Sequence, residues 1–425
     1  MSQPTSMRVQ PVVLGDGERM PVLVDEVGMP LFFPTLFITS RVRNSSKQAN
    51  TVLAYEDAIK RLYEWAASKQ LDLERRLFDQ QFLLDHEIES LVRSVGRKRS
   101  SRIRQSASTY LPLSKVVPKR LAERQISNAS KYRHLMYISS FLGWLARRLI
   151  ERRNRHIDLQ TEFAIKAMIS AIDIRRPRKG RCRMLALTRG LDHDEEERLL
   201  QAVAVTNEAG DDDQSCRDRI VVRLLHGLGM RAGELLALKV GDFNFRTNEV
   251  IVARRPDDSD DPRHIQPTAK TCDRRLPISA DVAKLVHDYV TKHRRNASRA
   301  KRHEFLIVVH RRGPWEGAPL SISGLRKVFA RLKSASKMER LTPHMLRHTN
   351  NDRFSELMDA EGVPEAEEDK LRSYAMGWKE GSGSAAVYTR RHTQRKAFDA
   401  AKKLQEGLYD KSKEKADRST RRTKS

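Results

Sequence analysis

A strongly basic segment at residues 173–189 divides the chain and restricts its possible folds more than any other feature. The segment is DIRRPRKGRCRMLALTR, in which Lys and Arg crowd around Pro177 and Gly180. It shows neither helical nor strand periodicity of apolar residues, so nothing in it is suited to hold it in a core. We therefore expect two domains joined by a basic linker over residues 175–189.

The regions on either side of the linker have different patterns. Residues 1–33 contain short apolar pieces separated by Gly and Pro, which predicts a small N-terminal β segment. In residues 34–174 apolar side chains recur at helical spacing, whereas residues 190–410 mix helix and strand patterns. Residues 411–425 are charged and aperiodic, and we expect them to be disordered. The predicted fold class is multidomain, with a helical domain followed by a mixed α/β, mainly α, domain.

The charge balance indicates a polyanionic partner. The chain has 81 Lys and Arg against 55 Asp and Glu, a formal net charge of +26. On a folded protein such an excess most often serves nucleic acid binding. A second basic run, VRSVGRKRSSRIRQ at residues 92–105, has the same character, although a solvated loop is the alternative interpretation of this run. The candidate DNA-binding residues in the two segments are Arg97, Lys98, Arg99, Arg102, Arg104, Arg175, Arg176, Arg178 and Lys179.

Cysteine usage and hydropathy narrow the class of protein further. Cys182, Cys216 and Cys272 lie far apart and form no CxxC pair, which excludes a disulfide framework and a zinc ribbon. No run of about 18 apolar residues and no signal-peptide pattern occurs. We expect a cytoplasmic protein without a membrane partner, a metal or a cofactor.

The first two of four sequence patches lie early in the second half. In HGLGMRAGELLALKVGDF (residues 226–243), Arg231 opens a helix, and Glu234 one turn later is placed to fix its guanidinium. In residues 250–279, two β-prone stretches (250–253 and 275–278) flank an acid-rich connection, and Lys270 stands just before the second stretch. Taken singly, a surface arginine and a solvated loop lysine are the ordinary interpretations.

The third patch is LTPHMLRHT at residues 341–349. Thr342 is a predicted N-cap, and the proline that follows it suits the first helical position. His344 and Arg347 are three positions apart and share one helix face. We expect His348 on a different face, as a packing or supporting residue.

The fourth patch is AMGWKEGSGSAAVYTRRH at residues 375–392. Its Gly-Trp pair, which includes Trp378, ends a helix, and a Gly/Ser-rich turn leads to Tyr388. A lone tyrosine in such a segment is usually a core residue. Tyr374 and Tyr409 are rival tyrosines, but the first precedes the Gly-Trp pair and the second follows too late.

Together these residue types fit the breaking of a phosphodiester without a metal. Arginine forks pair two phosphate oxygens at once, and such pre-placed charge is commonly a large catalytic contribution. Lysine and histidine donate and accept protons, and a phenol forms a covalent phosphotyrosine. No Asp/His metal cluster and no P-loop occurs in the sequence to suggest another chemistry.

The patches stand in the order of a known family. With Arg231, Lys270, His344-x-x-Arg347, Trp378 and Tyr388, residues 185–405 resemble the catalytic domain of the tyrosine recombinases, the phage integrase family. The N-terminal helical region resembles the family's core-binding (SAM-like) domain in placement and helical character. The chain departs from the family pattern in its long acidic connection DDSDD (257–261) and in Asn350 and Asn351, where apolar residues are usual.

The resemblance implies a role for each residue. Arg231 and Arg347 would clamp the scissile phosphate, and Tyr388 would attack it to give a 3′-phosphotyrosyl bond. Lys270 would be the general acid for the 5′ hydroxyl, with His344 assisting. The supporting roles are an indole N–H donated to the phosphate by Trp378, orientation of Arg231 by Glu234, and packing by His348.

The implied function is site-specific recombination or integration of double-stranded DNA for a mobile genetic element. The resemblance also implies a C-shaped clamp, a homotetramer on paired sites, and related recombinases or accessory proteins as further partners. A relaxing enzyme like the type IB topoisomerases is one alternative, and a non-catalytic DNA-binding regulator on a recombinase scaffold is another. Residues 393–410 predict an amphipathic helix that packs either on its own domain or on a neighbouring subunit.

Overall fold

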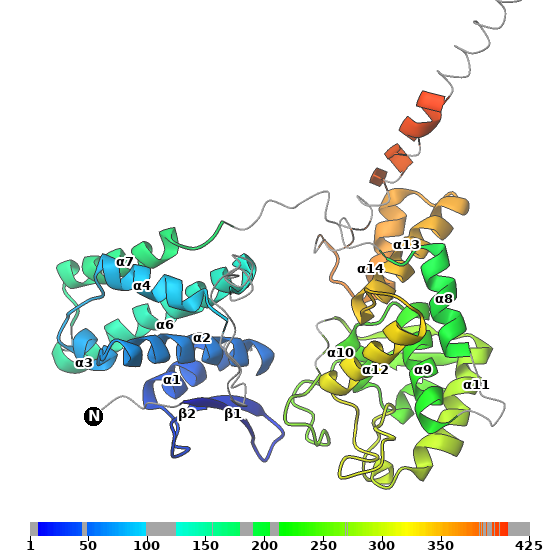
Figure 1. Cartoon of the computed structure of the whole chain (residues 1–425), viewed down its shortest axis with the longest axis horizontal. Coiled ribbons are helices and arrows are strands. Elements are labelled where there is room, and N and C mark those ends of the chain that lie inside the picture. The colour runs from blue at the N-terminus through cyan, green and yellow to red at the C-terminus, as the bar shows by residue number, and fades with distance from the viewer. Residues whose placement is uncertain are drawn as a thin grey trace, which may run out of the picture. The chain divides into compact units, whose positions relative to one another are not determined.

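The computed structural model divides into two compact units, Met1–Arg183 and Met184–Ser425. Each unit has its own hydrophobic core, and Figure 1 shows the elements of both. The structure describes residues 7–44, 49–98, 125–154, 156–178, 190–204, 212–267, 269, 271–381, 383, 385, 388, 393, 394, 396–398 and 400–406.

The first unit combines a two-stranded antiparallel sheet with a group of helices. Strands β1 (Arg8–Val13) and β2 (Arg19–Val24) pair over their full length, and both lie inside the segment predicted as β. A π-helical turn over Ile38–Arg43 continues the first helix. The labelled helices of this unit are α1 (Phe32–Phe37), α2 (Ala49–Ser68), α3 (Leu73–Phe78), α4 (Asp85–Val95), α6 (Asn128–Asn154) and α7 (Leu159–Ile174).

Aromatic side chains fill the centre of the first unit. The ring of Phe37 lies 5.3 Å from that of Phe141 and 5.3 Å from that of Trp144, measured between centroids. Helix α2 packs against both α6 and β2. Because several layers bury their apolar faces on α2, this unit has a closed core of its own.

Arg175 and Arg176, the first two residues of the predicted linker, are bonded to helices of the first unit. Arg175 ends α7, donates to the carbonyl of Ala171 at 2.9 Å and lies 3.3 Å from a carboxylate oxygen of Asp85. Arg176 donates to the hydroxyl of Ser139 at 2.6 Å. These internal bonds hold both arginines against the helices, so they are not residues of a free linker.

The second unit is mainly helical, with one small sheet. Its three strands are β3 (Phe243–Asn244), β4 (Glu249–Val252) and β5 (Arg274–Pro277), and both neighbouring pairs are antiparallel. Its labelled helices are α8 (His193–Ala204), α9 (Asp213–Gly227), α10 (Ala232–Ala237), α11 (Ala280–Asp288), α12 (Ile322–Ala335), α13 (Pro343–Ala360) and α14 (Glu365–Met376). Short 3₁₀ or π turns occupy Val240–Asp242, Tyr289–His293, Arg294–Asn296 and Ala300–Arg302.

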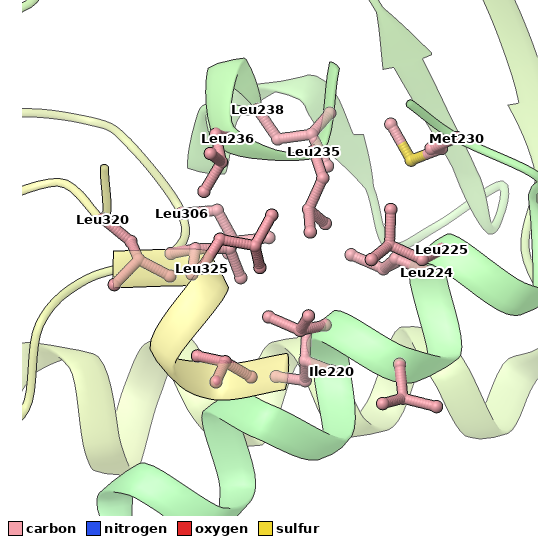
Figure 2. Packing of buried hydrophobic residues seen from close by; sticks show 14 of the residues in the cluster. Ile220, Leu224, Leu225, Met230, Leu235, Leu236, Leu238, Leu306, Leu320 and Leu325 are labelled. Carbon is pink, nitrogen blue, oxygen red and sulfur yellow. The ribbon is translucent and has the colours of Figure 1, made fainter. Parts of the chain in front are cut away.

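The core of the second unit fixes the short helix α10. Figure 2 shows Ile220 and Leu224 of α9, Leu235 of α10 and Leu325 of α12, which belong to one cluster of buried side chains. Helix α10 has only six residues and cannot be stable by itself. Burial of its leucines therefore sets where its first residue lies.

Shortening a buried leucine should weaken this unit selectively. Leu224 is fully buried, so Leu224→Ala is expected to lower the free energy of unfolding by about 2–5 kcal/mol through lost burial and a residual cavity. Calorimetry of the full chain should show a lower melting temperature for the second unit and an unchanged one for the first unit. Leu357→Ala, at a position 53% exposed, is the control and should leave both transitions in place. Equal shifts for the two variants would contradict the packing described.

No helix within the described ranges is both long enough and apolar enough to cross a bilayer.

Candidate active site

Arg231 occupies the N-cap position of α10, where Glu234 holds it. The backbone N–H of Arg231 donates to Glu234 at 3.0 Å, and its guanidinium lies 3.4 Å from the other carboxylate oxygen. The side chain of Glu234 is completely buried, whereas that of Arg231 is 34% exposed. The contact expected between these two residues is present, and the guanidinium of Arg231 still reaches the surface.

Arg347 is buried where α13 meets two other segments. The N-cap of α13 is Thr342, as predicted, and its hydroxyl accepts the N–H of Met345. The Arg347 guanidinium donates to the carbonyls of Gly229 at 2.6 Å and Met376 at 3.2 Å. Residue Arg347 is 1% exposed. This arginine therefore joins the segment before α10 to the end of α14.

His344 and His348 lie together on α13. Their ring centroids are 4.3 Å apart, and the ring of His348 lies 5.4 Å from that of Tyr388. The prediction that His348 points to a different face is wrong, because residues four apart on a helix are neighbours. His348 forms part of the wall against which the candidate nucleophile packs.

Trp378 and Tyr388 form a buried aromatic pair. Helix α14 ends at Gly377, which has a φ of +64°, and the N–H of Trp378 donates to the carbonyl of Ser373. The rings of Trp378 and Tyr388 stack with centroids 5.3 Å apart, and the Arg347 guanidinium lies over the indole. The indole Nε1 is buried and has no hydrogen-bond partner among the described residues.

Positive charge is concentrated at this place. Burial, together with the neighbouring positive charge of Arg231, lowers the pKa of Arg347 to about 10. Burial also lowers the pKa of His344, as do the charges of Arg347 and Arg231, so its imidazole is neutral at pH 7. Two neighbouring cations, one of them buried, favour the binding of an anion close to them.

Most of the predicted catalytic residues are thus brought together. Arg231, His344, Arg347, Trp378 and Tyr388 are linked by the contacts above, with Glu234 and His348 beside them. Lys270 lies outside the described residues. Among the rival tyrosines, Tyr374 is 64% exposed and Tyr409 also lies outside the described residues.

The nine predicted DNA-binding residues are not all found in the same kind of environment. Arg97, Lys98 and Arg178 are exposed on the first unit. Arg175 and Arg176 are held by the internal bonds already given, and the other four, Arg99, Arg102, Arg104 and Lys179, lie outside the described residues.

Sequence reasoning missed Arg274. Its side chain is 1% exposed and lies 2.8 Å from Glu234. The predicted strand began one residue later, at Arg275, so the inward position of Arg274 was overlooked. An arginine at an inward position of a strand is the signal that predicts a buried acidic partner.

The chain is similar to several known proteins. Residues 189–395 match the model of the phage integrase family. Tyrosine recombinase XerC of Listeria monocytogenes is 27% identical over 158 residues, 37% of this chain and 45% of XerC. XerD of Halalkalibacterium halodurans is 26% identical over 141 residues, 33% of this chain and 41% of XerD. Among solved structures, the Tn1549 transposon integrase in complex with transposon right end DNA is 14% identical, covers 87% of this chain and 100% of that one, and has a TM-score of 0.47.

Paired arginines, histidines, a tryptophan and a tyrosine on a mainly helical domain define the class of the tyrosine recombinases. The residues that match the phage integrase family model include Arg231, His344, Arg347, Trp378 and Tyr388. The match spans less than half the length of the curated relatives named above.

Proposed function

We propose that this protein is a site-specific recombinase that cuts and rejoins double-stranded DNA through a phosphotyrosyl bond. The observation that carries the proposal is the buried guanidinium of Arg347 beside Trp378 and the exposed end of Arg231. The described hydrogen-bond partners of Arg347 are carbonyls, which leave its charge uncompensated. A phosphodiester supplies the negative charge that such a site favours.

The chemistry follows from the nature of these groups. The Tyr388 hydroxyl oxygen attacks phosphorus, a P–O bond to tyrosine forms, and the bond to the 5′ oxygen breaks. The phenol loses its proton, for which neutral His344 is a suitable acceptor, and the 5′ oxygen gains one, for which we propose Lys270. The indole N–H of Trp378 is proposed to donate to a phosphate oxygen, since it is buried without a partner among the described residues. Attack by the released 5′ hydroxyl reverses the steps and rejoins a strand.

The proposed partners are two DNA recombination sites and further copies of this chain. We propose assembly as a homotetramer on paired sites of a mobile element, in the cytoplasm where the DNA lies. Exposed Arg97, Lys98 and Arg178 of the first unit are proposed to contact phosphates, which would position the protein without reading sequence.

Covalent capture tests the proposal. Duplexes selected by the full-length protein from a randomised library would be nicked near the centre of the selected sequence and incubated with it. We expect a protein–DNA adduct that survives detergent, has the DNA attached through its 3′ end, and forms equally well with EDTA present. The absence of any adduct would contradict the proposal. Relaxation of supercoiled plasmids without strand exchange between two selected sites would instead indicate a topoisomerase.

A further inference from the structure

The guanidinium of Arg274 lies behind the proposed site and bonds in several directions. Its Nη2 lies 2.8 Å from an oxygen of Glu234, and its Nε donates to the carbonyl of Ala375 at 2.8 Å. Unlike Arg347, Arg274 is paired with a carboxylate, and Nε, Nη1 and Nη2 all have partners within the protein, so Arg274 has neither an uncompensated charge nor an unused nitrogen for a DNA phosphate. Any effect on the reaction must therefore act through the residues that it holds.

The first of these residues is Glu234, which lies between two arginines. Its carboxylate is closer to Arg274, at 2.8 Å, than to the guanidinium of Arg231, at 3.4 Å. Burial alone would raise the pKa of Glu234, but the charge of Arg274 and the hydrogen bonds from Arg274, Thr271 and Arg231 together lower it. Because Arg274 neutralises the Glu234 carboxylate, the positive charge of Arg231 remains available to attract an anion.

The second contact fixes the carboxyl end of α14. The carbonyls of the last helical turn have no partner within the helix, and cations are favoured there. Arg274 fills that role at Ala375, three residues before Trp378. The backbone of Gly377 packs so closely that a Cβ at this position would lie 2.8 Å from Nη1 of Arg274. The place of Trp378 therefore depends on the place of Arg274.

The third contact involves Thr271, which directly follows Lys270 in the chain. The hydroxyl of Thr271 donates to Glu234 at 2.5 Å, and its oxygen lies 3.5 Å from Nη1 of Arg274. The N–H of Cys272 donates to the carbonyl of Gly377 at 2.9 Å. The backbone that follows the proposed general acid is thus bonded to the same cluster.

We propose that Arg274 is a positioning residue that sets the geometry of the segments carrying Arg231, Lys270 and Trp378. The inference rests on the proposed function and adds a residue that does not touch the DNA. A lysine at this position would keep the charge but not the planar fork that spans these partners. Misplacement of reacting groups by a small distance reduces a rate strongly while leaving binding intact.

The test compares Arg274→Lys with the wild type on the selected, nicked duplexes. With DNA saturating, we expect the rate of covalent capture to fall about 10–100-fold, as for other residues that orient catalytic groups. The dissociation constant for the same duplexes should remain that of the wild type, because no phosphate contact is removed. No adduct with the wild type would overturn the proposed function and this inference together. A normal rate for Arg274→Lys would overturn the inference alone.

Arg294 provides a matched control. It is also buried in the second unit, at 8% exposed, and donates to the carbonyls of Ala300, His303 and Phe305. Arg294→Lys should lose similar stability in a melting experiment and yet capture DNA at the wild-type rate. If Arg294→Lys slows capture as much as Arg274→Lys does, the effect is general loss of stability and the inference fails.

Two further variants, Arg274→Gln alone and Arg274→Gln combined with Glu234→Gln, test the inference if Arg274→Lys does not fold. Arg274→Gln leaves the Glu234 carboxylate uncompensated, so it should pair with Arg231 and slow capture. Adding Glu234→Gln removes that carboxylate, and we expect the double variant to capture DNA faster than Arg274→Gln alone. Equal or slower capture by the double variant would overturn the inference.

Discussion

Replacing Tyr388 with Phe is expected to reduce covalent capture of DNA by at least about 10³-fold, the scale on which removal of a nucleophile acts. The phenol oxygen is the atom that bonds to phosphorus in the proposed reaction. The phenyl ring of the variant keeps the stacking with Trp378 and the contact with His348. Binding to the selected duplexes should therefore be retained, which a filter or anisotropy assay would show alongside the capture gel.

Tyr374 supplies the control for this prediction. It lies on α14, is 64% exposed, and its hydroxyl is 3.5 Å from the carbonyl of Arg275. Tyr374→Phe should capture DNA at the wild-type rate. If capture survives in Tyr388→Phe and disappears in Tyr374→Phe, then Tyr374 is the nucleophile and the assignment to Tyr388 is wrong.

The second large effect is expected from Arg347→Lys, which should reduce the rate of capture about 10²–10³-fold, as for loss of one donor to a transition-state anion. A lysine cannot bond the carbonyls of Gly229 and Met376 and present a fork to a phosphate at once. Single-turnover capture with saturating DNA measures the effect. Binding should change far less, since many other basic residues contribute to it.

Arg217→Lys is the matched variant for this comparison. Arg217 is 3% exposed and lies 2.6 Å from Asp218, in a buried pair on α9. It should lower the melting temperature without slowing capture. Loss of activity in both variants to the same extent would mean that destabilisation, and not phosphate binding, explains the effect of Arg347→Lys.

Local rules predicted the elements that place the site. Thr342 before Pro343 marks the start of α13 because the hydroxyl caps the helix and proline needs no hydrogen-bond partner there. The two glycines before Arg231 interrupt the helical pattern, so that α9 ends at Gly227 and α10 begins directly after Arg231. Each signal depends on a few consecutive residues, so it can be recognised without tertiary structure.

Contacts between distant segments could not be predicted in this way. The bond from Arg274 to Glu234 joins residues 40 positions apart, and nothing in the local sequence indicates the partner. The unusual Asn350 is explained similarly, because its amide donates to the carbonyls of His226 and Gly227 at the end of α9. A polar residue at an apolar family position thus satisfies a helix end of this particular chain.

The acidic connection between β4 and β5 gives a further example. Asp258 lies 3.0 Å from Lys239, and Asp261 pairs with buried Arg263 at 2.8 Å. Sequence alone indicated only a long polar loop. Asp258 and Asp261 instead form ion pairs with basic residues of the second unit, and these pairs fix the conformation of the connection.

The most direct measurement is mass analysis of the peptide that remains bound to DNA after capture, nuclease digestion and proteolysis. We expect a nucleotide attached through its 3′ phosphate to the hydroxyl of Tyr388. An adduct on Tyr374, on Tyr409 or on any residue other than Tyr388 would contradict it.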